Sequence, residues 1–263
     1  MHVSVFRVDA FTDTIFTGNP AAVCPLASWP EDELLQAIAA ENNLSETAYL
    51  VPQGDNFGLR WFTPTCEVNL CGHATLASGF VILNILHPDR ESVRFETRSG
   101  RLTVSRDAER LAMDFPARPP WACTDPQAEL AEGLHASAQA SAVLEIKDNY
   151  FVVYESEETI RRIAPDFALL GKLHPFGVAV TAPGKDVDFV SRYFAPSYGI
   201  PEDPVTGSTH CSLAPYWGKR LGKKELHARQ VSARRGDLWC ELSGERVMIK
   251  GKAVLTLEGS MSV

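Results

Sequence analysis

The chain has 263 residues, of which 45% are hydrophobic and 22% are charged, as in an ordinary globular protein of one large or two medium domains. Its net charge of −8 and the absence of any basic run argue against binding to nucleic acid or to an anionic membrane surface. No signal peptide is recognisable, and no apolar run is long enough to cross a bilayer. We therefore expect a cytoplasmic protein whose six cysteines are reduced.

The first elements are short strands around one amphipathic helix. Alternation predicts a strand at residues 2–9, and a Gly18-Asn19-Pro20 turn leads to a second strand at residues 21–26. Ser28 and Glu31 have the spacing of a capping box, so a helix is predicted after them, ending at Asn42-Asn43. A strand at residues 44–51 then carries Glu46, and a hairpin turn returns the chain along residues 59–62.

The stretch from Arg60 to Leu86 passes from a strand through a polar turn into a helix. That helix, predicted from Ala74 to about Leu86, is apolar almost all the way round and must be buried on every side. Three short strands follow at residues 92–97, 101–105 and 110–115. A buried helix among many short strands predicts a sheet curled around that helix.

The second half of the chain repeats the style of the first. A proline-rich linker is predicted at residues 115–120. Beyond it, helices are predicted at residues 126–134 and 157–163, and strands at 140–146, 150–155, 177–181, 187–194, 227–232, 238–242, 246–250 and 254–258.

Two strings of the first half have counterparts in the second. Arg192-Tyr193-Phe194-Ala195-Pro196-Ser197 resembles Arg60-Trp61-Phe62-Thr63-Pro64-Thr65, and Thr206-Gly207-Ser208 then stands where Cys71-Gly72-His73 stood. The offset is 132 residues at the phenylalanines (194 − 62) and 135 at the glycines (207 − 72). The common order of strand, loop, glycine and helix predicts an internal duplication.

The two glycine-containing helix starts are candidate anion sites. A helix N-terminus presents free N–H groups and the positive end of the helix dipole, and glycine permits close approach of a ligand. Two such ends could hold one acidic substrate. Gly72 and Gly207 could equally be ordinary turn residues at helix starts.

Three titratable residues stand near these helix starts. Glu46 lies in an apolar strand, where a carboxyl group partly removed from water is suited to proton abstraction next to a carbonyl or conjugated system, although it could also be a solvent-facing strand residue. Asp203 could be a carboxylate at a helix N-terminus or a hydrogen-bond partner of substrate. His73 could cap its helix or polarise a substrate.

Two other kinds of site can be built from the same region. Cys71 with His73 or His210 could form a thiolate nucleophile pair, but no third orienting group is evident. A zinc site could use Cys66, Cys71, His73, His210 and Cys211, but no CxxC-type spacing supports it. Most of the cysteines are expected to be small core residues.

Four strings together resemble the phenazine-biosynthesis isomerase-like (PhzF-like) family. They lie at residues 18–23 (GNPAAV), 43–48 (NLSETA), 71–77 (CGHATLA) and 202–208 (EDPVTGS), so the resemblance covers essentially the whole chain. It implies an α+β fold, the duplicated diaminopimelate epimerase-like fold. This fold has two domains, each a curled, mostly antiparallel sheet wrapped around a central helix, related by a pseudo-two-fold axis with the site in the cleft between them.

The resemblance also implies boundaries and roles. The N-terminal domain would span residues 1–116 with a returning final strand at about 252–263, and the C-terminal domain residues 117–251. Glu46 would be the general acid/base, assisted by His73 and Asp203. The substrate-binding residues would be Gly72, Gly207, Ser208, Asn19 and Cys71. The protein would be a homodimer without metal or organic cofactor.

The related epimerases use two cysteines, one at each central helix. Cys71 resembles the first, but the second would fall at about Thr206, so a two-thiol epimerisation is not expected. We therefore predict a cofactor-independent isomerase that moves a proton on a small carboxylate-bearing metabolite. The alternative is a non-catalytic protein that binds small molecules or partner proteins in the same cleft.

Overall fold

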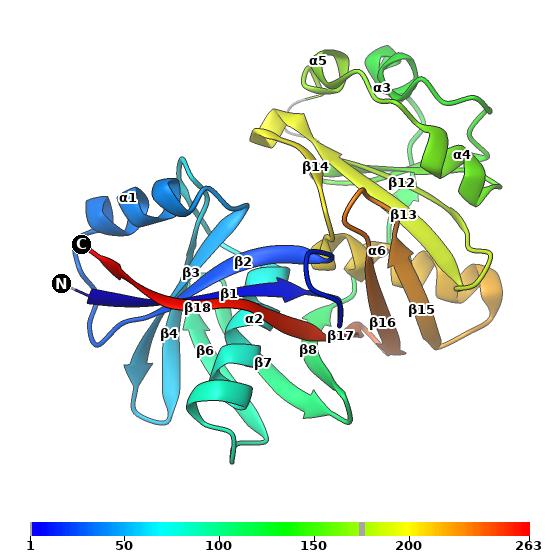
Figure 1. Cartoon of the computed structure of the whole chain (residues 1–263). Coiled ribbons are helices and arrows are strands. Elements are labelled where there is room, and N and C mark those ends of the chain that lie inside the picture. The colour runs from blue at the N-terminus through cyan, green and yellow to red at the C-terminus, as the bar shows by residue number, and fades with distance from the viewer. Residues whose placement is uncertain (1, 174–176) are drawn as a thin grey trace. The chain divides into compact units, whose positions relative to one another are not determined.

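The computed structural model describes residues 2–173 and 177–263 (Figure 1). The chain divides into two compact units, one formed by Met1–Asp114 with Lys250–Val263 and the other by Phe115–Ile249. Each unit combines a mostly antiparallel sheet with a buried helix, which confirms the predicted fold class.

The N-terminal unit contains eight complete strands, most of a ninth and two regular helices among its described residues. The strands are β1 (His2–Ala10), β2 (Asn19–Pro25), β3 (Glu46–Gln53), β4 (Asn56–Phe62), β5 (Glu67–Val68), β6 (Ser92–Thr97), β7 (Gly100–Asp107), β8 (Arg110–Pro116) and β18 (Ala253–Ser262). The helices are α1 (Asp32–Asn42) and α2 (Gly72–Val81), and α2 continues as a π-helical turn, η1 (Ile82–Leu86).

In the sheet of this unit, the first and last strands of the chain are neighbours. β1 pairs antiparallel with both β18 and β2, so the final strand lies beside the first (Figure 1). β2 and β3 are parallel, β3 and β4 antiparallel, and β4 pairs with β6 in parallel. β6, β7 and β8 complete an antiparallel series.

Helix α2 is the centre of this unit. It contacts β1, β2, β3, β7 and β18, so strands surround it, as its all-round apolar sequence predicts. Its buried hydroxyl groups bond to the helix itself, because Thr75 and Ser78 donate to the carbonyl oxygens of Cys71 and Ala74. Gly79 allows close packing on β7, since a Cβ there would lie 2.5 Å from a Val104 methyl group.

The C-terminal unit contains the remaining elements. Its strands are β9 (Trp121–Ala122), β10 (Ala142–Ile146), β11 (Asn149–Val153), β12 (Gly177–Pro183), β13 (Phe189–Ala195), β14 (Ile200–Asp203), β15 (Glu225–Gln230), β16 (Gly236–Ser243) and most of β17 (Arg246–Gly251). Its helices are α3 (Ala128–Leu134), α4 (Glu157–Arg162), α5 (Phe167–Leu170), α6 (Gly207–Leu221) and the 3-10 turn η2 (Pro196–Tyr198).

The pairing of these strands repeats that of the first unit. β10 and β11 are antiparallel, β11 and β12 parallel, β12 and β13 antiparallel, and β13 and β15 parallel. A short strand, β14, pairs antiparallel with β13 as β5 does with β4. The register matches too, because Phe62 is opposite Glu67 and Phe194 is opposite Glu202. The sequence echo is therefore an internal structural repeat.

The same ionic fork holds the short strand in each unit. Arg60 binds Glu67 through Nε and a terminal nitrogen at 2.8 and 2.6 Å, and Arg192 binds Glu202 at 2.8 and 3.0 Å. Each guanidinium also lies over the phenylalanine two residues later, at 5.1 Å from the Phe62 ring and 4.9 Å from the Phe194 ring. Such bidentate pairs fix geometry as well as charge.

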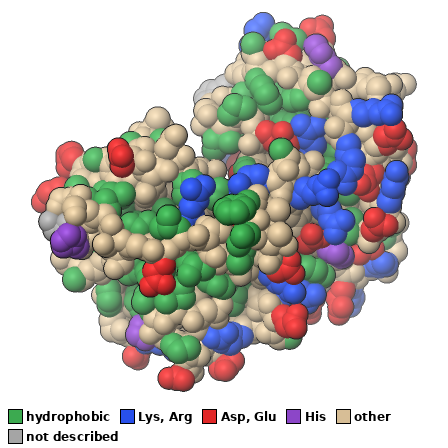
Figure 2. Space-filling view, in the orientation of Figure 1, with side chains coloured by type: hydrophobic (Ala, Val, Ile, Leu, Met, Phe, Trp, Pro, Cys, Tyr) green, Lys and Arg blue, Asp and Glu red, His purple; other side chains and the backbone are tan. Residues whose placement is uncertain are grey.

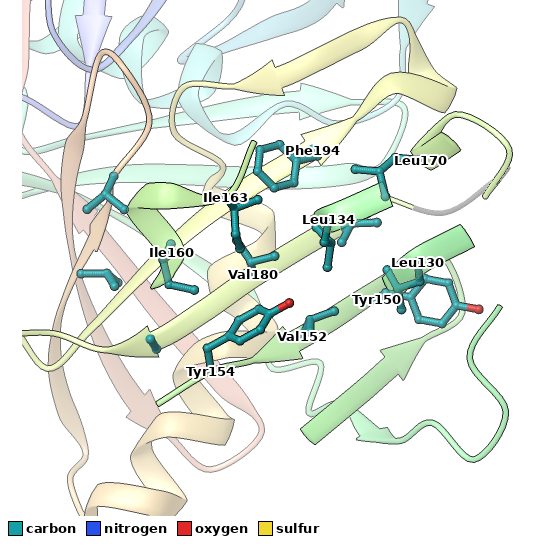
Figure 3. Packing of buried hydrophobic residues seen from close by; sticks show 14 of the residues in the cluster. Leu130, Leu134, Tyr150, Val152, Tyr154, Ile160, Ile163, Leu170, Val180 and Phe194 are labelled. Carbon is teal, nitrogen blue, oxygen red and sulfur yellow. The ribbon is translucent and has the colours of Figure 1, made fainter. Parts of the chain in front are cut away.

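A second core lies on the sheet face away from the central helix in each unit. In the C-terminal unit, α3, α4 and α5 cover side chains such as Val152, Val180 and Phe194 (Figure 3). In the N-terminal unit, α1 covers a cluster that includes Cys24, Tyr49 and Phe62.

Some local predictions were wrong. The Ser28–Glu31 capping box does not form, because Glu31 itself is the N-cap of α1 and its side chain makes no capping bond. The helix predicted from Ala74 begins earlier, at Gly72, and its last turn is π-helical. The short elements β5, β9, β14 and α5 were not predicted.

The visible surface carries charges of both signs. Figure 2 shows basic and acidic side chains interspersed on the visible face. Among the described residues, no helix is long and apolar enough to span a membrane.

Candidate active site

Glu46 is the first residue of β3, placed there by the end of the preceding helix. Asn43 ends α1 in a left-handed conformation with φ 47°, after which the chain turns into β3. β3 runs parallel to β2, with Glu46 opposite Ala21. Glu46 is therefore held at the start of an interior strand, with only 11% of its side chain exposed.

A tight turn places Asn19 at the start of β2. Gly18 has φ +67°, and a Cβ at this position would lie 2.3 Å from the carbonyl oxygen of Ala10, so only glycine fits. Asn19 follows it and is fully buried. Its side-chain nitrogen lies 3.1 Å from Nδ1 of His73.

His73 lies in the first turn of α2 and connects the other polar groups. Its Nε2 atom is 3.2 Å from Oε2 of Glu46, and its Nδ1 atom faces both Asn19 and, at 3.5 Å, the sulfur of Cys71. The Nε2–Oε2 contact is short in distance but poorly aligned as a hydrogen bond. The imidazole thus stands between the carboxylate and the thiol.

The environment of His73 favours its charged form. Burial by itself would lower the pKa of His73, but the nearby Cys71 sulfur and Glu46 carboxylate outweigh burial and hold the pKa well above 6.5. Burial raises the pKa of Cys71 itself to about 11, so Cys71 is a neutral thiol at neutral pH. At neutral pH the Glu46 carboxylate is therefore the group that raises the pKa of His73. The site is therefore a carboxylate–imidazolium pair with a thiol beside it.

Glu46 presents one oxygen to His73 and keeps the other free to react. Oε2 is fully buried against the ring. Oε1 has no hydrogen-bond partner in the described part of the chain and belongs to the exposed part of the side chain. A carboxylate with one anchored and one free oxygen has the geometry that a positioned general base needs.

The structure adds a third residue to the thiol-nucleophile alternative, but it keeps the thiol uncharged. Glu46 supplies the third, orienting group that the sequence did not reveal, giving the order Cys71–His73–Glu46. However, Cys71 is only 6% exposed and its pKa is raised by burial, whereas a nucleophilic thiol needs a lowered pKa.

The zinc alternative meets a geometric obstacle. Of its five candidate ligands, His210 and Cys211 belong to the other unit, and the compact metal-type group is Glu46, Cys71 and His73, with ligand atoms within 4.8 Å of one another. The thiol and the carboxylate face different ring nitrogens. One ion bound by all three would use a single ring nitrogen and would compete with a contact that His73 makes in the structure.

The N-terminus of α2 lies in the same region. Cys71 is the N-cap and makes no side-chain capping bond, and the first turn holds no acidic residue. The N–H groups that begin at Gly72 thus lack a built-in anion, and an external carboxylate could bind to them. Gly72 and Cys71 therefore adjoin His73 and Glu46 in one half of the predicted site.

The remaining predicted residues form a second cluster at the start of α6. Asp203 ends β14 and accepts a 2.5 Å hydrogen bond from the Thr206 hydroxyl group through Oδ2. Gly207 and Ser208 begin α6, and Ser208 is exposed. As in α2, the N-cap, Thr206, makes no side-chain capping bond, and the first turn holds no acidic residue.

Two buried residues hold this second cluster in place: Gln230, which the sequence did not suggest, and His210, which it suggested only as a thiol partner or zinc ligand. Gln230 donates to the Asp203 carbonyl oxygen at 2.7 Å and accepts from the Thr206 N–H at 2.9 Å. His210 donates from Nδ1 to the Thr206 carbonyl oxygen at 2.8 Å. The sequence could have predicted that Gln230 is buried, because it lies on the buried face of the alternating strand ELHARQ.

The structure thus brings Asn19, Glu46, Cys71, Gly72 and His73 together in the N-terminal unit. Asp203, Gly207 and Ser208 lie together in the C-terminal unit. That the two groups share one cleft stays a prediction.

The chain is similar to known proteins over nearly its whole length. The family model described as phenazine biosynthesis-like protein matches residues 8–259. An uncharacterized isomerase of Pseudomonas aeruginosa is 53% identical over 261 residues, covering 99% of both chains. The crystal structure of a phenazine biosynthesis protein of the PhzF family from Enterococcus faecalis has a TM-score of 0.95 and 44% identity, with all of both chains covered.

A more distant structure shares the fold alone. A hydroxyproline epimerase from Agrobacterium vitis, solved with trans-4-hydroxy-L-proline, has a TM-score of 0.63 at 9% identity, covering 98% of this chain and 92% of the epimerase. With the family model matching nearly from end to end and a half-identical relative of the same length, the chain belongs to the phenazine biosynthesis-like (PhzF) family.

Proposed function

We propose that the protein is a cofactor-independent isomerase in which Glu46 moves a proton between two carbon atoms of a small carboxylate-bearing metabolite. The observation that carries the proposal is the buried Glu46 carboxylate, with Oε2 3.2 Å from Nε2 of His73 and Oε1 without a hydrogen-bond partner among the described residues. The naming of relatives as isomerases supports the reaction class. For the substrate, we propose only a chemical class.

In the proposed reaction, Oε1 of Glu46 takes a proton from a carbon next to a carbonyl, carboxyl or conjugated group. The electron pair left behind is delocalised into that group, and the protonated Glu46 returns its proton to another carbon, so no atom is gained or lost. The His73 imidazolium compensates the negative charge that passes between Glu46 and the substrate. The proton movement needs only side chains.

The helix starts supply the proposed recognition of substrate. N–H groups at the start of α2, beginning at Gly72, would bind a carboxylate, and the Asn19 amide, turned so that its oxygen faces Nδ1–H, would hold the charged His73 ring in position. Asp203, Gly207 and Ser208 are proposed to contact substrate as well, with Gln230 and Thr206 fixing their loop. A homodimer in the cytoplasm remains our expectation.

A screen for solvent deuterium tests the reaction class. The purified protein would be incubated in deuterium oxide with pools of small unsaturated or β,γ-functionalised carboxylic acids and amino acids, and mass gain at carbon would be measured by mass spectrometry. We expect protein-dependent deuterium uptake at carbon in at least one member. Stabilisation of the protein by pool members without any uptake would instead favour the binding-protein alternative.

A further inference from the structure

A second candidate binding site lies entirely within the C-terminal unit, and its lining includes none of the residues of the proposed reaction. It is a pocket of about 370 Å³ between α3, the irregular segment that follows α3, and strands β10 and β11. This volume falls within the usual range for small-molecule sites. The lining residues are Pro126, Gln127, Ala128, Leu130, Ala131, Leu134, Ala136, Ala138, Gln139, Ala140, Val143, Val152 and Tyr154.

The pocket has a buried apolar floor and an exposed rim. Leu130, Leu134, Val152 and Tyr154 are each at most 3% exposed and belong to the outer core cluster, in which Figure 3 shows them. The rim is formed by residues such as Gln127, Ala131 and Gln139, which are exposed. A ligand could therefore enter from solvent and rest on the core.

The pocket exists because the helix layer is incomplete here. Five alanines line it, so the covering segments contribute little side-chain volume. Helix α3 is only seven residues long and packs tightly on α5 at Gly133, where a Cβ would lie 2.7 Å from Leu170. That close contact leaves Ala128 and Ala131 at the pocket.

In the N-terminal unit, a longer helix covers the outer face of the sheet. There α1, eleven residues long, covers the outer face of the sheet with Leu35, Ile38 and Ala39. The buried Tyr49 hydroxyl on that face donates to the Leu35 carbonyl oxygen at 2.6 Å. A buried tyrosine hydroxyl normally has such a partner.

The Tyr154 hydroxyl has no comparable partner. The residue is 3% exposed, and within the described residues its hydroxyl makes no hydrogen bond, although its backbone N–H donates to Thr181. Burial raises the pKa of Tyr154 to about 12, so the hydroxyl stays neutral and can either donate or accept. Tyr154 lines the pocket, so its hydroxyl can offer a ligand one specific hydrogen bond.

The chemistry of the lining defines the ligand class. Among the described residues, no charged side chain lines the pocket, and the side-chain amides that line it are at the rim. The larger groove near the C-terminal end of α6 differs, since Lys219, Lys223, Lys224 and Glu245 are among its lining residues. An ion would lose hydration in the apolar pocket without gaining a counter-charge.

We propose that this pocket binds a small, uncharged, largely apolar molecule, such as an aromatic bicycle, through one hydrogen bond to the Tyr154 hydroxyl. The site is distinct from the proposed acid/base residues and does not depend on the proposed isomerase reaction.

Binding of indole, compared with its near-isostere benzothiophene, tests the proposal. Isothermal titration calorimetry on the full chain should show one saturable indole site, with benzothiophene binding about five- to tenfold more weakly because it lacks the N–H donor. Tyr154→Phe should reduce indole affinity to the benzothiophene level. Tyr216→Phe, the matched control in α6, should leave it unchanged.

A pocket-filling variant locates the site. Ala131→Leu should abolish indole binding, whereas Ala168→Leu, at an exposed alanine of α5 outside the pocket, should not. Circular dichroism and thermal unfolding would establish that each variant is folded. Absence of saturable indole binding to the wild-type protein, equal affinity for the two probes, or indole binding that survives Ala131→Leu would overturn the proposal.

Discussion

Nε2 of His73 lies 3.2 Å from Oε2 of Glu46, and both atoms are buried. The first belongs to the opening turn of the central helix and the second to the start of a central strand, so two rigid elements set the distance. Rigid support of this kind is what a positioned acid/base group requires. The pair is therefore the feature on which our account of this protein depends.

The charge state of His73 should depend on Glu46. We expect nuclear magnetic resonance titration to place the pKa of His73 well above 6.5 in the wild-type protein, and Glu46→Gln to lower it, because burial would then dominate. A His73 pKa that did not fall in the Glu46→Gln protein would contradict the assigned ion pair.

The same pair has a consequence for stability. Because the folded-state pKa of His73 is raised, its contribution is complete below the unfolded-state pKa of about 6.5 and is lost as the pH rises through the folded-state value. In denaturant titrations, the difference in unfolding free energy between the wild-type protein and His73→Gln should shrink as the pH rises from about 6.5 through the folded-state pKa of His73.

Buried His210 should act in the opposite direction. Burial lowers the pKa of His210 to about 4, so the folded state takes up a proton less readily than the unfolded state. Its stabilising effect is present above about pH 6.5 and is lost as the pH falls toward 4, by about 3 kcal/mol in total.

His210→Asn provides the comparison, because the asparagine amide can still donate to the Thr206 carbonyl oxygen. We expect urea denaturation of this variant to show a smaller loss of stability between pH 6.5 and pH 4 than the wild-type protein shows. Equal losses in the two proteins would mean that His210 does not titrate as proposed.

The fork of the C-terminal unit should matter to folding. Arg192 is only 12% exposed and also donates to the carbonyl oxygens of Ile160 and Ile163, so Arg192→Met should cost about 3 kcal/mol by leaving Glu202 and these oxygens unpaired. Arg162→Met removes an exposed surface pair with Glu158 and should cost less than about 0.5 kcal/mol. Equal costs in chemical denaturation would refute the structural role of the fork.

Cysteine reactivity should follow exposure. Cys66 is exposed, whereas Cys71 is 6% exposed with its pKa raised to about 11. Iodoacetamide at neutral pH, followed by peptide mass spectrometry, should modify Cys66 well before Cys71. Preferential alkylation of Cys71 would revive the thiolate-nucleophile interpretation.

The duplicated fold could be predicted because its signals are local. Strand alternation and the all-round apolar helix are each readable within about fifteen residues, and the duplication follows from comparing two such local strings. The short strands β5 and β14 could not be predicted, because they have two and four residues and are held by forks from Arg60 and Arg192. No local pattern records such a contact.

The site was predictable in its residue types but not in its contacts. The motif resemblance pointed to Glu46 and His73, yet the ring's position between carboxylate and thiol comes from a turn at Gly18 and the packing of α2. Gln230 was missed because it binds Asp203 and Thr206 from more than twenty residues away. The capping-box prediction failed because the helix starts at Asp32, which puts Ser28 too far upstream to cap it.

The most direct test of the central claim is proton exchange by Glu46→Gln on a substrate that the deuterium screen identifies. Glutamine keeps the size of the side chain and its contact with His73 but cannot accept the proton. Deuterium uptake at carbon, followed by mass spectrometry, should fall by at least about a hundredfold, while circular dichroism and the unfolding midpoint show that the fold is retained. Undiminished uptake by the folded Glu46→Gln protein would contradict the assignment of Glu46 as the acid/base.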